Sequence, residues 1–306
     1  MHNDIALPSG ITVIERGWLS ANNILLVGEK TAIVDSGYAT HAPQTIALIE
    51  AALNGRPLDL LLNTHLHSDH CGGNAALQAR YPEVQTWVPP GHAALVQDWD
   101  PVGLSYTPTG QQCPRFKLND VLQPDTDVQL GALTWQIHAA PGHDPHSVVL
   151  FQPDHRILIS ADALWERGFG VVFPELDGEQ AFAEVGATLD LIERLAPHTI
   201  IPGHGSVFTD VGTSLAYARH RLHGFIHDPK KHVIHAGKVL LKFKLLELQR
   251  IPLVQLLEWA CQTTMMTSMH RNYFSALTLH DWIKQLADSL VAVGAAALED
   301  GNMVNT

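Results

Sequence analysis

The chain has 306 residues, of which 46% are hydrophobic and 16% charged, and its formal net charge is −12. This length accommodates one large domain, or a domain of ordinary size with a small extension. The negative charge argues against a general nucleic-acid-binding surface, and no apolar run reaches the ~18 residues of a membrane span. The first residues lack the basic start and apolar core of a signal peptide, so we expect a cytoplasmic protein.

The first quarter of the chain combines strand patterns with one helical pattern. Residues 11–16, 23–27 and 31–35 are rich in β-branched and aliphatic side chains, and a glycine-containing turn between the last two predicts a hairpin. Residues 43–53 carry apolar side chains at helical spacing. Residues 58–63 form a continuous apolar run, which is typical of a strand covered by helices on both faces.

Three histidines and an aspartate follow this last strand within six positions: His65, His67, Asp69 and His70. Imidazole nitrogen and carboxylate oxygen are ligands that zinc and similar cations prefer. His65 and His67 are two residues apart, so on an extended chain they share one face and can converge on one ion. Asp69 and His70 come where the chain must turn, and they can reach a second point nearby. The segment therefore predicts a metal site.

The three cysteines, Cys71, Cys113 and Cys261, are odd in number and far apart, which argues against a disulfide framework. Cys71 lies within the histidine-rich segment. It either touches a metal or, as we favour, fills a small buried space.

Residues 98–125 contain proline, glycine and glutamine and have no regular period. Loops of this length are uncommon unless they have a role, such as covering a site. Their apolar side chains either line a substrate cleft or pack a surface loop: Trp99, Leu104, Tyr106 and Phe116.

Strand patterns at 133–139, 147–152 and 157–160 come next, followed by a helical pattern over 178–196. Asp177 with Gln180 three residues later has the spacing of an N-terminal capping box. A further strand begins at Thr199.

The motif H-x-H-x-D-H-x-G-G at residues 65–73 resembles the signature of the metallo-β-lactamase-fold hydrolases, in their dinuclear branch. Pro-Gly-His at 141–143, an aspartate at 162 that ends a strand, and Gly-His-Gly at 203–205 match the later ligand positions of that family, in order. The resemblance implies an α/β fold: an αββα sandwich of two mixed sheets flanked by helices, over residues 1–228.

The resemblance also implies the roles of seven residues around two divalent metal ions. The first ion would bind His65, His67 and His143, and the second Asp69, His70 and His204, with Asp162 bridging the two. A hydroxide between the metals would attack the substrate, because metal binding lowers the pKa of water from ~15.7 towards ~7. Asp69 would orient the hydroxide and pass its proton to the leaving group. The ligand types favour zinc, with iron or manganese compatible.

Two further residues near the motifs carry open interpretations. In the family an Asp-x-Gly such as the one beginning at Asp35 lies close behind the metal site, and we favour a structural role for this aspartate. Where relatives often have Thr-Pro-Gly after the third histidine, this chain has Asp-Pro-His at 144–146. His146 is either near the substrate or, as we favour, a hydrogen-bonded residue of the turn.

From residue 229 onwards the pattern is mainly helical, with helices over 233–248, 253–264 and 279–293 and a hairpin within 295–304. Residues 229–306 therefore predict a small second domain. Three helices and a hairpin resemble the winged-helix-like extension of some hydrolases of the same superfamily, ribonucleases among them.

A basic strip accompanies this change of pattern: Arg219, Arg221, Lys230, Lys231, Lys238, Lys242, Lys244 and Arg250. Such a strip can be the solvated side of amphipathic helices, a phosphate-binding surface for nucleic acid, or a site for the anionic tail of a coenzyme.

The dinuclear pattern resembles glyoxalase II and related thioesterases, phosphodiesterases and lactonases more than true β-lactamases. We therefore expect a metal-dependent hydrolase of a thioester or similar carboxylic ester, acting on a small molecule that can be anionic or coenzyme-linked. A phosphodiesterase or ribonuclease is the alternative enzyme, although a nucleic acid partner is not favoured. A metal-containing ligand-binding regulator with little turnover is the third interpretation. The sequence does not indicate an oligomeric state.

Overall fold

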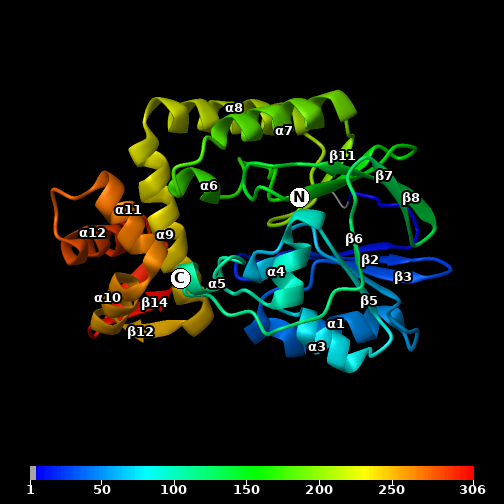
Figure 1. Cartoon of the computed structure of the whole chain (residues 1–306), viewed down its shortest axis with the longest axis horizontal. Coiled ribbons are helices and arrows are strands. Elements are labelled where there is room, and N and C mark those ends of the chain that lie inside the picture. The colour runs from blue at the N-terminus through cyan, green and yellow to red at the C-terminus, as the bar shows by residue number, and fades with distance from the viewer. Residues whose placement is uncertain (1–4) are drawn as a thin grey trace.

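The computed structural model describes residues 5–306, in which two mixed β-sheets pack face to face between two layers of helices (Figure 1). In spatial order the first sheet contains β1 (Ile11–Ile14), β2 (Asn23–Val27), β3 (Thr31–Val34), β4 (Leu60–Leu62), β5 (Gln85–Val88) and β6 (Asp120–Val121). Strands β1 to β3 are antiparallel, as the predicted hairpin requires, and β3 to β6 run parallel.

The second sheet contains, in spatial order, β11 (Thr199–Pro202), β10 (Ile157–Ala161), β9 (Val148–Gln152), β8 (Leu133–Ala139) and β7 (Thr126–Leu130). Only β10 and β11 pair in parallel. Side chains such as Ile24, Leu62 and Trp135 fill the space between the two sheets.

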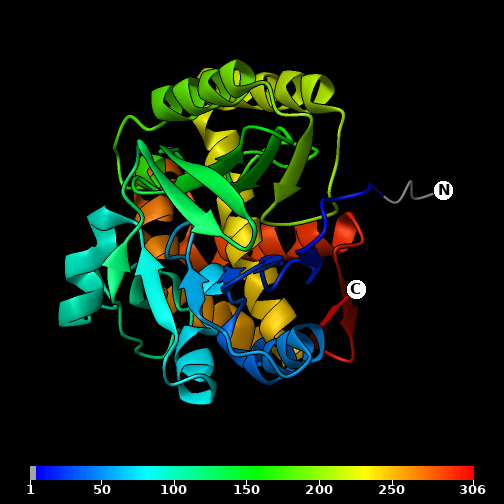
Figure 2. The same ribbon diagram turned by 90° about the vertical axis from the view of Figure 1, so that its right-hand side faces the viewer.

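Helices α1 (Ala42–Leu53) and α3 (Asn74–Arg80) cover the outer face of the first sheet, and α7 (Phe182–Leu195) and α8 (Val211–His227) cover that of the second (Figures 1 and 2). Because side chains alternate along a strand, Ile24 faces the other sheet while its neighbour Leu25 faces the helices. The predicted αββα sandwich is confirmed.

The start of α7 differs from the prediction. The helix begins at Phe182 rather than near residue 178, and Asp177 does not cap it. The Glu175 carboxylate, at the end of α6 (Phe173–Leu176), accepts hydrogen bonds from the Ala181 and Phe182 N–H groups at 2.8 and 3.1 Å. The capping group thus comes from an upstream turn, which local spacing could not indicate.

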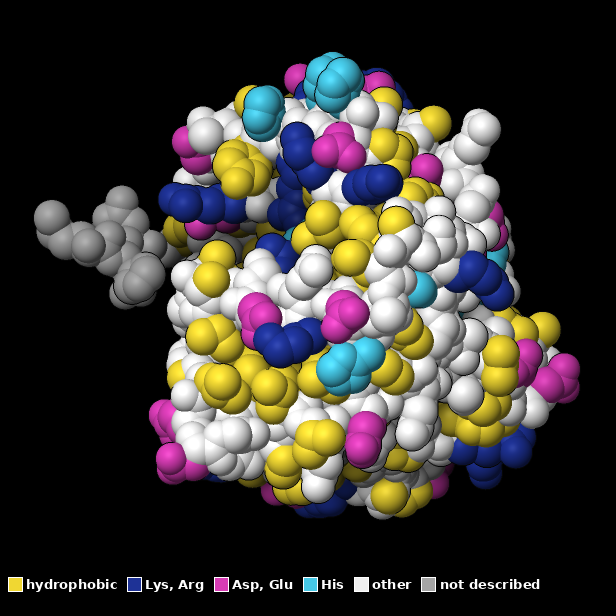
Figure 3. Space-filling view, turned by 90° about the vertical axis from the view of Figure 1, so that its left-hand side faces the viewer, with side chains coloured by type: hydrophobic (Ala, Val, Ile, Leu, Met, Phe, Trp, Pro, Cys, Tyr) yellow, Lys and Arg dark blue, Asp and Glu magenta, His cyan; other side chains and the backbone are white. Residues whose placement is uncertain are grey.

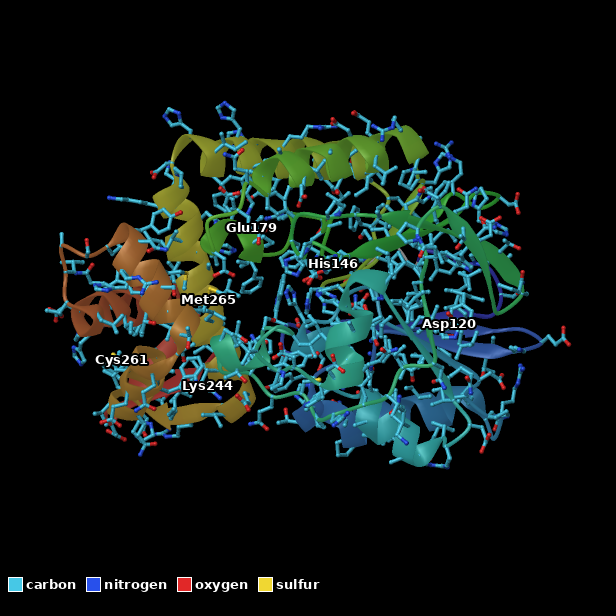
Figure 4. The ribbon with its side chains drawn as sticks, viewed as in Figure 1. Asp120, His146, Glu179, Lys244, Cys261 and Met265 are labelled. Carbon is cyan, nitrogen blue, oxygen red and sulfur yellow. The ribbon has the colours of Figure 1, made fainter. Side chains whose placement is uncertain are left out.

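Replacing Glu175 with alanine should lower the free energy of unfolding by about 1 kcal/mol, because two N–H groups at the start of α7 lose their acceptor. Urea denaturation followed by circular dichroism measures this change. Glu179 is the matched control, because it is exposed in the same connection (Figure 4) and an alanine there should change stability by less than about 0.5 kcal/mol. Equal losses in the two variants would contradict the capping role.

The C-terminal region consists of helices α9 (Pro229–Leu248), α10 (Leu253–Gln262), α11 (Thr264–Tyr273) and α12 (Leu279–Ala292) with a three-stranded sheet of β12 (Arg250–Pro252), β14 (Asn302–Asn305) and β13 (Ala296–Glu299). The helices share a core that includes Leu240, Met266 and Ile283. The sequence did not predict α8 or α11. The division at residues 228 and 229, which falls between α8 and α9, stays a proposal, as does the winged-helix likeness.

The segment 98–125 is ordered and packed. It follows 3₁₀ helix Pro90–His92 and α4 (Ala93–Asp98), and it contains the short helix α5 (Tyr106–Thr109). Its apolar side chains pack with Leu66, Cys71 and Val88 in one cluster: Trp99, Leu104, Tyr106 and Phe116. No helix within residues 5–306 is long and apolar enough to cross a membrane.

Candidate metal centre

The seven predicted ligands come together at one edge of both sheets. His65 and His67 follow β4, Asp69 and His70 lie in the short helix α2 (Ser68–Cys71), and the remaining three follow β8, β10 and β11. Their donor atoms form three overlapping groups, each with all atoms within 4.8 Å: His65, His67 and His143; His65, His70 and Asp162; Asp69, His70 and His204.

The first group is built by three imidazole rings. His143 Nε2 lies 2.8 Å from His67 Nδ1 and 3.2 Å from His65 Nε2. Oδ2 of Asp162 lies 3.4 Å from the same His143 nitrogen. Three ring nitrogens and one carboxylate oxygen thus surround one point.

The second group uses the other oxygen of the same aspartate. Asp162 Oδ1 lies 3.4 Å from His70 Nε2 and 3.9 Å from His204 Nε2. Asp69 Oδ2 lies 3.1 Å from His204 Nε2 and 4.0 Å from His70 Nε2. Asp162 therefore presents one oxygen to each group, which is the arrangement a bridging carboxylate needs.

Hydrogen bonds on the opposite ring nitrogens fix three of these histidines. Nδ1 of His70 donates to Asp35 at 2.8 Å, Nδ1 of His143 to the Val171 carbonyl at 2.5 Å, and Nδ1 of His204 to the Gly17 carbonyl at 3.1 Å. A proton on Nδ1 leaves the lone pair of Nε2 free to face the cluster. Asp35 thus acts on a candidate ligand directly, in addition to bonding the backbone N–H of Thr64.

One buried atom of the cluster has no conventional partner. Within the described residues, His70 Nε2 is buried and makes no hydrogen bond. Such an orphaned atom in a polar cluster is the position where a bound ion is expected.

The protonation states of the candidate ligands favour the binding of cations between them. Burial and the neighbouring histidines lower the pKa of His65 well below its usual value and that of His67 to about 3, so both rings are neutral at pH 7. Burial opposes the charged form of His70 as well, but Asp162, Asp35 and Asp69 raise its pKa well above its usual value. Neutral imidazoles and ionised carboxylates are the metal-binding forms, and metal binding would release the protons held here.

Two glycines make room for the cluster. A Cβ atom on Gly203 would lie 2.2 Å from Asp162 Oδ1, and one on Gly170 would lie 2.4 Å from His143 Nδ1. Only glycine fits these close approaches. The donor set, the orphaned nitrogen and this space together fit two divalent cations.

Cys71 takes no part in the donor groups. Its sulfur lies 3.3 Å from the His67 carbonyl oxygen and 3.1 Å from the Tyr106 hydroxyl, within the packed cluster around segment 98–125. The cysteine fills buried space, as favoured from the sequence.

A cavity of about 520 Å3 extends from the candidate metal ligands towards the C-terminal region. Trp18 and Trp165 flank its entrance to the cluster: the Trp18 ring stacks on His204 with centroids 5.4 Å apart, and Trp165 Nε1 donates to Asp162 Oδ1 at 3.2 Å. Phe173 packs against the ring of His67 at 4.9 Å. Sequence reasoning missed these three aromatic residues because they lie outside every motif.

The far wall of the cavity comes from α9. His235, Lys238, Lys242 and Leu246 line it at helical spacing, so one face of α9 points to the cavity. Segment 98–125 contributes Ser105, Thr109 and Gln111 rather than its aromatic residues. The four apolar side chains of the segment thus follow the packed-loop alternative, and the side chains that reach the cavity are polar.

His146 lies on the turn between β8 and β9 (Figure 4). Its backbone N–H donates to Asp144 Oδ1 at 2.8 Å, and its ring packs edge-on against His92 with centroids 4.7 Å apart. Its ring does not line the cavity. The structure favours the turn interpretation.

The eight residues of the basic strip have three kinds of neighbour. Four members make ion pairs: Arg219 with Asp190 and Glu193, Lys231 with Asp228, Lys244 with Glu247, and Arg250 with Glu299. Arg221, Lys238 and Lys242 instead line the cavity. The eighth member, Lys230, has its Nζ 5.7 Å from the centroid of the Phe274 ring.

Comparison with known proteins agrees with this fold. The family model of the metallo-beta-lactamase superfamily matches residues 16–204. The hydroxyacylglutathione hydrolase of Brucella anthropi is 26% identical over 170 residues, covering 53% of this chain and 51% of that protein. The mitochondrial persulfide dioxygenase of Homo sapiens is 27% identical over 184 residues, covering 60% and 56%. The chain thus spans about half the length of these curated relatives.

Among solved structures, a beta-lactamase domain protein from Burkholderia ambifaria superposes with a TM-score of 0.60 at 21% identity, covering 99% of this chain and 94% of that one. This likeness extends over the C-terminal region and concerns the fold alone. The protein belongs to the metallo-beta-lactamase superfamily. The relatives that it matches include proteins named hydroxyacylglutathione hydrolase and persulfide dioxygenase.

Proposed function

We propose that the protein hydrolyses a thioester or similar carboxylic ester of a small molecule, with two divalent metal ions bound by His65, His67, His143, Asp69, His70, His204 and Asp162. The observation that carries this proposal is the position of Asp162 between the two groups of ligands, with one carboxylate oxygen towards each group. The relatives named hydroxyacylglutathione hydrolase support a thioester as the substrate class.

Bound metal ions would supply an activated water at neutral pH and would polarise the carbonyl oxygen of the substrate. Proton transfer is assigned to a side chain of the protein. Asp69 is ionised, because His70 and His204 lower its pKa against the effect of burial. Its carboxylate borders the cavity and can accept the proton of the attacking water and give it to the departing sulfur or oxygen.

The shape of the cavity favours a small substrate over a polymer. Side chains of helix α9 line the cavity, and the aromatic rings of Trp165 and Phe173 lie beside the candidate ligands. A pocket of about 520 Å3 can hold a small molecule and position its reacting carbonyl group. Zinc is the metal that the ligand types favour, and iron or manganese are tested alongside it.

The test compares an acyl thioester, bis(p-nitrophenyl) phosphate and a short RNA as substrates, with and without a chelator. We expect thioester hydrolysis that the chelator abolishes and added zinc restores. Metal content measured by mass spectrometry identifies the native ion. RNA cleavage with the thioester left intact would show a nuclease instead. No turnover of any substrate, together with a metabolite that raises Tm, would indicate a regulator.

A further inference from the structure

We propose that Arg221 and Lys238 form a binding site for an anionic group of the substrate, in the same cavity that the candidate metal ligands line. The inference rests on the proposed thioester hydrolysis and narrows its substrate class. The substrate would be a thioester with a hydrophobic body and a carboxylate or phosphate group.

Two partly buried cations of this cavity lack anionic partners. Arg221 and Lys238 both line it, and no carboxylate within residues 5–306 lies within 4.0 Å of their charged nitrogens. Lys242, by contrast, is engaged, because its Nζ donates to the Ala295 carbonyl and to Asn305 Oδ1 at 2.6 Å each. Unpaired cations beside a cavity favour a bound anion, since a partly desolvated charge is costly without a partner.

Arg221 is held in place rather than free in solution. Its guanidinium group lies over the rings of Phe169 and Phe225, at 5.6 and 5.4 Å from their centroids, and Nη2 donates to His235 Nε2 at 2.6 Å. Burial and Arg221 itself lower the pKa of His235 to about 3, so this histidine is a neutral acceptor and does not cancel the charge. A fixed guanidinium with free donors suits carboxylate or phosphate recognition.

Apolar side chains also line the cavity. They include Val171, Val239, Phe243 and Leu246, which offer hydrocarbon contacts to an apolar part of the substrate. Figure 3 shows Lys and Arg side chains gathered around a hollow in the upper half of this face, with hydrophobic side chains beside it.

The test uses non-hydrolysable thioethers, so binding is measured without turnover. Isothermal titration of the metal-loaded protein compares S-hexyl-coenzyme A, which carries phosphates, S-hexylglutathione, which carries carboxylates, and the neutral S-hexyl-N-acetylcysteamine. We expect at least one anionic ligand to bind roughly ten times more tightly than the neutral ligand or better. The preferred ligand identifies phosphate or carboxylate as the recognised group.

Arg221→Gln should reduce the ratio of anionic to neutral affinity by roughly 10- to 100-fold, the range for losing a hydrogen bond to a charged group. Lys238→Gln should reduce the same ratio, and this variant tests the site if the Arg221 variant does not fold. Arg219→Gln is the matched control, because Arg219 lies on the same helix but is paired with Asp190 and Glu193 outside the cavity.

Equal binding of the anionic and neutral ligands by the wild-type protein would overturn the anion site. So would an equal loss in the Arg219→Gln and Arg221→Gln proteins. These results would leave thioester hydrolysis standing, because a neutral thioester could still be cleaved. Conversely, selective anion binding without hydrolysis of any thioester would retain the anion site and reject the proposed reaction.

Discussion

Replacing Asp162 with alanine should remove at least one metal ion per chain and nearly all hydrolytic activity. Both oxygens of this side chain face ligand groups, Oδ2 towards His143 and Oδ1 towards His70 and His204. Without it, five histidines and one carboxylate would have to balance two dications in a buried site. Loss of a residue that only hydrogen-bonds to a metal ligand lowers activity by about 10- to 100-fold. We expect a larger fall here, because Asp162 itself would bind both ions.

Metal content by mass spectrometry and turnover of the thioester measure the two effects separately. Asp154→Ala is the control, because Asp154 is an exposed aspartate in the turn that precedes β10. That variant should retain the wild-type metal content and rate. An Asp162→Ala protein with two bound ions and normal turnover would refute the bridging role.

Asp35→Asn should weaken metal binding about 10- to 100-fold while the protein stays folded. The carboxylate of Asp35 is 1% exposed, and it accepts hydrogen bonds from His70 Nδ1, Thr64 N–H and the Thr64 hydroxyl at 2.8, 2.9 and 2.8 Å. Asparagine keeps one acceptor oxygen but places an NH2 group where the second oxygen accepts. His70 then loses its charged partner and its fixed orientation. Competition with a chromophoric chelator measures the change in metal affinity.

Asp59→Asn separates this effect from a general loss of stability. Asp59 also accepts two hydrogen bonds from one threonine, Thr31, at 2.7 and 3.1 Å, but it lies outside the metal cluster. Both variants should lose about 1–3 kcal/mol of unfolding free energy in the metal-free protein. Only Asp35→Asn should change metal affinity. The same affinity in the two variants would contradict the orienting role of Asp35.

The αββα class could be predicted because the motifs that carry the resemblance to the metallo-β-lactamase fold are local. Two features can be recognised in the sequence without any knowledge of packing. They are the hydrophobic strands that end in ligand-type residues and the order of the motifs. Helix α1 was also predictable from its apolar spacing. The cap of α12 was predictable because Thr278 Oγ1 accepts a hydrogen bond from the Asp281 N–H at 3.1 Å within one turn. The cap of α7 was not, because Glu175 belongs to the preceding helix.

The sequence by itself determined which residue types could bind metal and in what order they occur, because those residues sit in short motifs at the ends of strands. The resemblance implied a bridging role for Asp162, whereas only the tertiary structure decided that Trp18 and Trp165 border the ligands and that α9 lines the cavity. The basic strip illustrates the difference most clearly. Arg219 and Arg221 are two residues apart on one helix, yet one pairs with surface carboxylates and the other enters the cavity. Helix rotation and the neighbouring elements set that distinction, and neither is encoded in local spacing.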